Sequence, residues 1–315
     1  MAVSYRKRYE ARLTSFWYWR KQMNSDKNSV APKVWLITGC STGLGRALAE
    51  AVLKKGDSLI ATAREPEQLR ALIEPYPETA KAVRLDVTLP QDIQSAIDIA
   101  IATFGRIDVL VNNAGHGLIA ALEEVSDVDI HQFFETNFFG AVRLMRAVLP
   151  LMRRQGSGHI VNISSTAGWV GFGGSSLYCG AKFALEGTSE ALAKEVESFG
   201  IKVTLIEPGA FRTDFNGRSL AAAEQPIHAY ALVSGTSLKW FKEMDGKQPG
   251  NPAKAAQAII QAVESPNPPM RLALGTDAMS LIQEKLKSVK MDLDAWQQVT
   301  VSTDYTDRNS EIMVG

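Results

Sequence analysis

The stretch "WLITGCSTGLGRALAEAV" (residues 35–52) decides the fold. It begins with a short apolar run, passes through a turn rich in glycine, and continues with apolar residues at helical spacing. A turn of this kind between a strand and a helix lets the backbone approach a pyrophosphate, which the free N–H groups of the helix N-terminus attract. It therefore predicts a dinucleotide-binding turn, with contacts from Gly39, Ser41, Thr42, Gly43, Leu44 and Gly45.

From Lys33 onward, apolar or β-branched runs alternate with longer segments of helical periodicity. This alternation is typical of βαβ units on a parallel sheet. The expected strands are "KVWLIT", "SLIATA", "AVRLDV", "IDVLVN", "HIVNIS", "KVTLIE" and "RLALG". The fold class is therefore α/β, with one seven-stranded parallel sheet. We expect a single domain over residues 30–315, because no segment between Lys33 and Gly275 has the composition of a linker.

The bulk composition excludes several classes of function. Lys and Arg together number 34, as do Asp and Glu, so the net charge gives no attraction to nucleic acid. Two cysteines, Cys40 and Cys179, cannot build a disulfide framework, and we expect a cytoplasmic protein. The four histidines are scattered without metal-ligand spacing, so no metal site is predicted. No apolar run approaches the roughly 20 residues that span a bilayer.

Residues 1–29 form a basic, aromatic extension that opens with "MAVSYRKRYEARLTSFWYWRKQ". One interpretation is an interfacial membrane helix or a targeting peptide. The other is an exposed appendage, or a working start at Met23. We favour this second interpretation because the charges surround the aromatic residues and leave no separate polar face.

Further motifs follow the glycine-rich turn in a fixed order: "LDV" (85–87), "NNAG" (112–115), "TNFFG" (136–140), "VNISS" (161–165), "YCGAK" (178–182) and "EPGAFRT" (207–213). Together with the TGxxxGxG spacing of the turn, they resemble the compact NAD(P)-dependent branch of the short-chain dehydrogenase/reductase family. The resemblance covers about residues 33–275. The chain is also similar to bacterial oxidoreductases related to retinol and hydroxysteroid dehydrogenases. The resemblance implies a doubly wound sheet of the Rossmann type with strand order 3-2-1-4-5-6-7, and an oxidoreductase acting on CH–OH groups.

The resemblance also assigns coenzyme contacts outside the turn. The adenine would be contacted by Asp86 and Val87. The ribose would lie beside Asn113, Ala114 and Gly115, and the nicotinamide beside Pro208, Gly209 and Thr213.

The end of the second expected strand bears on the choice of coenzyme. An acidic residue there would bind the ribose 2′-hydroxyl of NAD and repel a 2′-phosphate. This chain has Ala63 followed by Arg64. A guanidinium can pair with a phosphate through two hydrogen bonds, so NADP is favoured over NAD, although Arg64 at a helix start can also serve only as a solvated surface residue.

The helix that begins near Tyr178 carries the chemistry. Tyr178 and Lys182 are i and i+4 neighbours on one helix face. A lysine ammonium beside a phenol stabilises the phenolate, so we expect Lys182 to lower the pKa of Tyr178 from its usual value of about 10. Tyr178 would then act as a general acid/base, and both residues would also contact the coenzyme.

Two more residues complete the expected catalytic set. Ser165, thirteen residues before Tyr178, would donate a hydrogen bond to the substrate oxygen, with Ser164 as its rival. Asn137 corresponds to the family residue that holds a water between Lys182 and solvent. The catalytic residues are thus predicted to be Asn137, Ser165, Tyr178 and Lys182.

A long irregular insertion over about residues 211–251 predicts the substrate loop. Phe215, Leu220, Ile227, Tyr230 and Leu232 would give it an apolar lining, which suits a lipophilic ketone, aldehyde or secondary alcohol. Two other functions remain open: a nucleotide-binding regulator without turnover, and an epimerase or dehydratase that shares the YxxxK motif.

The family resemblance also implies a homodimer or homotetramer, packed through the helices that begin near His131 and Tyr178. A C-terminal extension over about residues 278–315 would cover such a surface or cap the pocket.

Overall fold

The computed structural model describes residues 32–305. The chain divides into two compact units, Met1–Lys33 and Val34–Gly315, and all the helices and strands described below belong to the second. The predicted extension at residues 1–29 lies outside the described residues, as do the last ten residues of the C-terminal extension.

Seven parallel strands form the main sheet, in the order β3-β2-β1-β4-β6-β7-β9. Counted within this sheet alone, the order is the predicted 3-2-1-4-5-6-7, so the fold prediction is confirmed. Each strand falls within or beside its predicted segment. They are β1 (Val34–Ile37), β2 (Ser58–Ala63), β3 (Ala80–Arg84), β4 (Val109–Asn112), β6 (Gly158–Ile163), β7 (Ile201–Pro208) and β9 (Arg271–Leu274).

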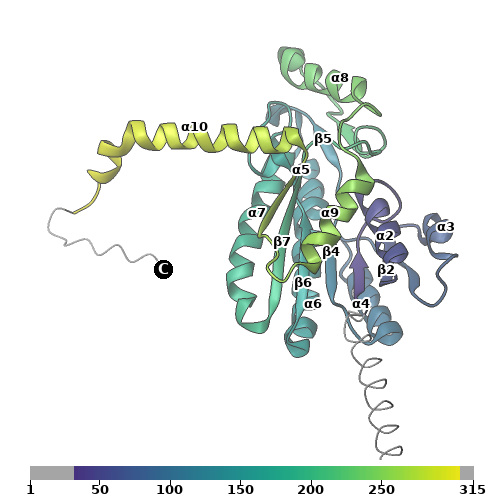
Figure 1. Cartoon of the computed structure of the whole chain (residues 1–315). Coiled ribbons are helices and arrows are strands. Elements are labelled where there is room, and N and C mark those ends of the chain that lie inside the picture. Colours follow the sequence, from purple (N-terminus) through teal and green to yellow (C-terminus); the bar gives the residue numbers. More distant parts are fainter. Residues whose placement is uncertain (1–31, 306–315) are drawn as a thin grey trace, which may run out of the picture. The chain divides into compact units, whose positions relative to one another are not determined.

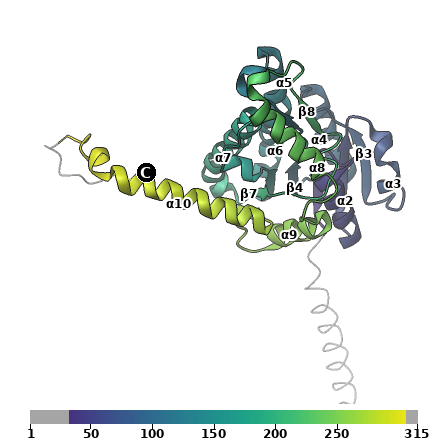
Figure 2. The same cartoon turned by 90° about the horizontal axis from the view of Figure 1, so that it is seen from above.

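Helices cover both faces of this sheet (Figures 1 and 2). Side chains of β1 alternate between the two resulting cores, with Trp35 and Ile37 in one and Leu36 in the other. The first core is closed by α2 (Gly43–Lys55) and α9 (Pro252–Glu264), the second by α4 (Pro90–Phe104), α6 (Gly140–Gln155) and α7 (Ser176–Val196).

The remaining elements are short, apart from the C-terminal helix. They are η2 (Pro66–Leu69), α3 (Arg70–Ile73), β5 (Gly117–Ile119), η3 (Leu122–Glu124), α5 (Asp127–Phe134), η4 (Glu135–Phe139), η5 (Thr166–Gly168), η6 (Glu197–Phe199), β8 (Leu220–Ala222), η7 (His228–Tyr230), η8 (Ala231–Gly235), α8 (Thr236–Glu243) and α10 (Thr276–Val301).

The predicted substrate loop, residues 211–251, is more regular than expected. Its strand β8 pairs in parallel with β5, so that Gly117 lies opposite Leu220. Two carboxylates of η3 hold the loop further along: Glu124 accepts a hydrogen bond from the Ile227 amide at 2.9 Å, and Glu123 accepts one from the Tyr230 hydroxyl at 2.7 Å. These contacts fasten the loop to the segment that follows β4.

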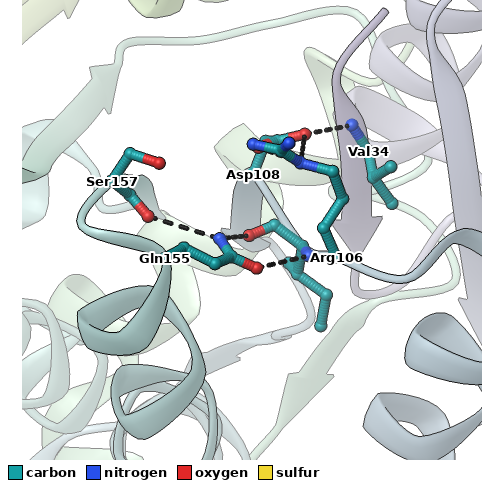
Figure 3. Close-up of polar contacts among 6 residues, drawn as sticks. Val34, Arg106, Asp108, Gln155 and Ser157 are labelled. Atoms are coloured by element: carbon teal, nitrogen blue, oxygen red, sulfur yellow. Dashed lines mark hydrogen bonds and ion pairs between the residues drawn. The ribbon is translucent and has the colours of Figure 1, made fainter.

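Side chains join the amino ends of β1 and β4, at the end of the sheet where these strands begin (Figure 3). Asp108, just before β4, accepts hydrogen bonds from the Val34 amide and the Arg106 guanidinium, both at 2.9 Å. Gln155, at the end of α6, accepts from the Ile107 amide at 3.3 Å and donates to its carbonyl at 3.0 Å. In doubly wound sheets ligands bind outside the carboxyl ends of the strands, so the site is expected at the opposite end of the sheet.

Candidate active site

The turn between β1 and α2 has the backbone geometry that only glycine adopts easily. Gly39 and Gly43 have φ values of +70° and +63°, in the left-handed region. A Cβ on Gly45 would lie 2.4 Å from both the Gly39 carbonyl oxygen and the side-chain nitrogen (Nδ2) of Asn113. The turn therefore needs glycine at all three predicted positions, two for conformation and one for close packing.

The N-terminus of α2 carries no competing anion. Thr42 is the N-cap residue, yet its side chain makes no capping hydrogen bond, and the first turn of the helix contains no acidic residue. Ser41, Thr42, Gly43 and Leu44 are each partly exposed at this position. Uncapped helix N–H groups attract anions through hydrogen bonding and the helix dipole. The turn thus has the donor set that a pyrophosphate requires.

The segment after β4 is bonded directly to this turn. The Thr38 hydroxyl oxygen accepts hydrogen bonds from the amides of Asn113 and Ala114, at 2.8 and 2.9 Å. The Asn113 side chain donates to the carbonyl oxygens of Thr38 and Gly39, at 2.8 and 3.1 Å. Gly115 passes so close to Asn137 that a Cβ would lie 2.8 Å from its side-chain oxygen. Thr38, which the sequence analysis did not single out, is therefore the residue that joins two coenzyme motifs.

Three further predicted contacts lie at the ends of β2 and β3. Arg64 is exposed directly after β2. The Asp86 carboxylate accepts hydrogen bonds from the Thr88 amide and hydroxyl, at 2.9 and 2.7 Å, which fixes its orientation. Val87 is buried against α6, where a Cβ on Gly140 would approach its side chain to 2.7 Å.

Asn137 lies in η4, a π-helical segment between α5 and α6. Such segments are rare and occur mostly at functional sites. The buried Asn137 side chain accepts a hydrogen bond from the His116 amide at 3.0 Å and donates one to the Phe133 carbonyl at 3.1 Å. It thereby ties the end of the "NNAG" segment to the helix.

Tyr178 and Ser165 interact, and Ser164 points elsewhere. The Ser165 hydroxyl lowers the pKa of Tyr178, but burial has the larger effect and raises that pKa to about 12. The Ser164 hydroxyl, which is buried, acts instead on the carboxyl of Glu186. The two adjacent serines therefore serve different neighbours, and only Ser165 acts on the tyrosine.

The raised pKa of Tyr178 is opposite to the expectation from the sequence. Lys182 Nζ lies 5.7 Å from the centre of the Tyr178 ring and donates a hydrogen bond to the Ile163 carbonyl at 2.8 Å. Burial lowers the pKa of Lys182 to about 8, which the charge of Glu186 partly opposes. The lysine is thus held over the ring, and desolvation of the phenol by burial is what raises its pKa in the protein alone.

An ionic cluster lies beneath the serine strand end, with Glu186 and Glu207 buried, Arg271 half-buried and Glu190 exposed. Arg271 Nε lies 3.2 Å from a carboxylate oxygen of Glu186 and 3.5 Å from one of Glu207, while its terminal nitrogen lies 2.7 Å from Glu190. Burial raises the pKa of Glu186 to about 7 and also raises that of Glu207. The Arg271 guanidinium also lies over the Trp169 ring, 5.2 Å from its centre. The motifs gave no sign of this cluster, because Arg271, which joins the three carboxylates, is distant from all of them in sequence.

The turn after β7 is fastened to the start of α10. The Asp277 carboxylate accepts a hydrogen bond from the Ala210 amide at 2.7 Å. It lies so close to Gly209 that a Cβ there would approach to 2.3 Å. Thr213 lies over the glycine-rich turn, 3.6 Å from where a Cβ of Gly43 would be. Of these three predicted contacts, Thr213 lies beside the glycine-rich turn, Gly209 packs against Asp277, and Pro208 pairs with Leu274 at the end of β7.

The substrate loop reaches Tyr178 with an aromatic side chain. The Phe215 ring centre lies 5.7 Å from that of Tyr178, and the Phe133 ring centre lies 6.5 Å from it. Leu220 packs close to Gly117, where a Cβ would lie 2.7 Å from its methyl group. Leu232 differs from the prediction: it is 89% exposed and does not line this region.

Comparison with known proteins settles the family. The short chain dehydrogenase family model matches residues 33–224. The chain belongs to the short-chain dehydrogenase/reductase family. It is therefore an NAD(P)-dependent oxidoreductase acting on CH–OH groups.

Individual relatives cover most of the chain. Oxidoreductase BOA17 of Botryotinia fuckeliana is 39% identical over 86% of this chain and 99% of its own length. Human retinol dehydrogenase 8 is 39% identical over 77% of this chain and 81% of its own. A short-chain dehydrogenase structure from Streptomyces avermitilis is 46% identical, with a TM-score of 0.82, and covers 88% of this chain and all of that one.

Solved structures of the fold hold either coenzyme. ElxO, 29% identical with a TM-score of 0.66 over 79% of this chain and 99% of its own, was solved with NADP bound. A 22% identical enzyme from Burkholderia phymatum, which shares the fold, was solved with NAD. No helix within residues 32–305 has the length and apolar character needed to cross a membrane.

Proposed function

We propose that this enzyme is an NADP-dependent reductase of lipophilic carbonyl compounds, with Tyr178 as the proton donor. The observation that carries the proposal is the position of a partly buried, protonated Tyr178 beside Ser165, Lys182 and the aromatic side chain of Phe215. The segment after β4 is bonded to the glycine-rich turn through Thr38 and Asn113, and to η4 through Asn137.

The residues present fit a dinucleotide. The cradle at Gly39 and Gly45 leaves no room for side chains, and the first turn of α2 offers uncapped amides without a competing carboxylate. The pyrophosphate would be held by residues 39–45, the adenine by Asp86 and Val87, and the ribose by Asn113, Ala114 and Gly115. Pro208, Gly209 and Thr213 would flank the nicotinamide, which supplies the hydride.

Each catalytic side chain then has a defined task. Ser165 orients the substrate carbonyl by donating a hydrogen bond to its oxygen, and Tyr178 gives the same oxygen a proton as the carbon is reduced. A pKa of about 12 keeps Tyr178 protonated at neutral pH, which suits the reductive direction. The Lys182 ammonium stabilises the phenolate that remains. Asn137 lies where a relay could return a proton to the site.

Arg64 supports NADP as the coenzyme. Its exposed guanidinium follows β2 directly, and the preceding residue, Ala63, is small and neutral. A 2′-phosphate there would gain a charge-assisted pair, whereas NAD would find no carboxylate to accept a hydrogen bond from its 2′-hydroxyl. The NADP complex of ElxO supports the same choice.

The contacts around Tyr178 support a lipophilic substrate. Phe133, Phe215 and Leu220 surround the tyrosine and the start of β5 with apolar surface. The similarity to a retinol dehydrogenase points to the same class of compound. We further propose a cytoplasmic location, which the free, buried state of both cysteines supports.

The test is a screen of lipophilic ketones and aldehydes, measured as the loss of NADPH absorbance, with NADH as the matched coenzyme. We expect turnover with at least one lipophilic carbonyl compound and a higher kcat/KM with NADPH. Turnover confined to polar carbonyl compounds, or a preference for NADH, would contradict the corresponding part of the proposal.

A further inference from the structure

The helix α10 carries apolar side chains that nothing in the described chain covers. Every residue from Gln283 to Val301 is exposed, although the helix runs without a break from Thr276. Leu286 is 52% exposed, Leu293 62% and Trp296 64%. Helices in proteins derive most of their stability from packing of an apolar face. A helix this long, with large side chains in solvent, therefore needs a partner.

Six apolar residues of α10 follow a heptad repeat: five are exposed and Ile282 is partly buried, while the exposed Met291, Val299 and Val301 lie outside the repeat. The steps between the six alternate between three and four residues, which is the spacing of a coiled-coil seam. The seam, as we call this set, consists of Met279, Ile282, Leu286, Val289, Leu293 and Trp296. Its period is that of helix-on-helix packing, so the partner it fits is another helix with the same repeat.

We propose that α10 pairs in antiparallel orientation with α10 of a second copy of this chain. A two-fold axis between residues 287 and 288 makes the pairing self-complementary. Leu286 then packs against Val289 of the second copy, Ile282 against its Leu293, and Met279 against its Trp296. Every seam residue has an apolar partner in this register.

Charges beside the seam select this orientation. Lys285 and Asp292 occupy the positions that directly precede seam residues Leu286 and Leu293. In the antiparallel register Lys285 faces Asp292 of the second copy, and the symmetry makes this ion pair twice. A parallel pair would set Lys285 against Lys290 of the second copy. Flanking charges of this kind determine the orientation of helices in coiled coils.

The charge of α10 also distinguishes a second copy from a lipid surface. The helix has four carboxylates against three lysines, at Lys285, Lys287 and Lys290. Helices that bind anionic membranes are rich in lysine and arginine on their polar face. The helix therefore lacks the attraction to a membrane surface, whereas its charges match those of its own copy.

Sedimentation of the full chain tests the pairing. We expect the double variant Leu286→Asp/Leu293→Asp to have half the particle mass of the wild type. Met291→Asp is the matched control: Met291 is 61% exposed, close to the value for Leu293, but lies outside the seam. It should leave the mass unchanged. An unchanged mass in the double variant, or an equal loss in the control, would overturn the proposal.

Charge exchange tests the orientation. Lys285→Asp and Asp292→Lys should each weaken association by about tenfold or more, because like charges then face each other. The double exchange K285D/D292K should restore it. In a parallel pair Lys285→Asp would instead strengthen association, which would overturn the antiparallel register. A membrane partner would give a different result. Wild type would then float with anionic vesicles, and Leu286→Asp/Leu293→Asp would lose this binding without any change in particle mass, which would overturn the proposal.

Discussion

Replacement of Glu186 by Gln should stabilise the protein above neutral pH, although it removes a charge that faces Arg271. The Glu186 side chain is only 7% exposed, and burial raises its pKa from 4.5 to about 7 even with Arg271 3.2 Å away. At 1.36 kcal/mol per pKa unit, ionised Glu186 therefore costs about 3 kcal/mol in the folded state. Gln has the shape of the protonated acid and avoids this cost.

The pH dependence follows from the direction of the shift. Because the folded pKa lies above 4.5, the folded protein binds more protons than the unfolded chain between pH 4.5 and 7. The wild type should lose stability as pH rises through this range and level off above it. We expect Glu186→Gln to exceed the wild type in unfolding free energy by about 2–3 kcal/mol at pH 8, and by about 1 kcal/mol or less at pH 5.

Urea unfolding at pH 5, 6.5 and 8, extrapolated to water, measures this difference. Glu190→Gln is the matched control, since Glu190 pairs with the same Arg271 at 2.7 Å but is 51% exposed. The pKa of Glu190 is lowered by that pairing, so its replacement should slightly destabilise the protein, by less than about 1 kcal/mol. A Glu186→Gln variant that is less stable than wild type at pH 8, or a difference that does not change with pH, would refute the reasoning.

Two further substitutions test the coenzyme site. Arg64→Ala should raise the KM for NADPH by about 10–100-fold, as expected for loss of a charged hydrogen bond, and leave the KM for NADH nearly unchanged. Arg70→Ala is the control, because Arg70 is also exposed. An equal effect of Arg64→Ala on both coenzymes would contradict the role of Arg64. Gly45→Ala should lower stability by about 1–3 kcal/mol and weaken coenzyme binding, because its Cβ would lie 2.4 Å from the Gly39 carbonyl oxygen. Gly187 lies in α7 and an added Cβ there would have no atom within 4 Å, so Gly187→Ala should instead raise the melting temperature. A lower melting temperature for Gly187→Ala than for Gly45→Ala would be incompatible with the close packing at Gly45.

The sequence predicts the sheet well because local patterns determine its strands. Each of the seven runs alternates or concentrates apolar residues, and the glycine spacing at Gly39, Gly43 and Gly45 fixes the first crossover. The small sheet of β5 and β8 was not predicted, because Gly117 and Leu220 pair across about a hundred residues. Helix α7 ends at Val196, and Phe199, three residues further on, lies in η6 and is 41% exposed.

The site was likewise predictable where it depends on residues close in sequence, and not where it depends on residues far apart. Tyr178 and Lys182 are one helical turn apart, so their proximity followed from spacing alone. The pKa of Tyr178 did not, because it depends on burial by segments as distant as Phe133 and Phe215. Asp277 and Arg271 escaped notice for a related reason: their partners are brought together only by the sheet order.

The C-terminal helix was predictable in part. The spacing from Met279 to Trp296 was present in the sequence, but the segment was interpreted only as an extension that covers a surface or caps the pocket. The structure shows instead a helix of 26 residues whose distal part is exposed throughout.

The most direct measurement of the central claim is single-turnover reduction of a lipophilic carbonyl compound by NADPH-loaded Tyr178→Phe. The account predicts a fall of about 10²–10⁴-fold in the rate of the chemical step, the usual contribution of a general acid, with the Kd for NADPH unchanged within about threefold. A rate equal to that of the wild type, with the coenzyme bound, would contradict the assignment of Tyr178 as the proton donor.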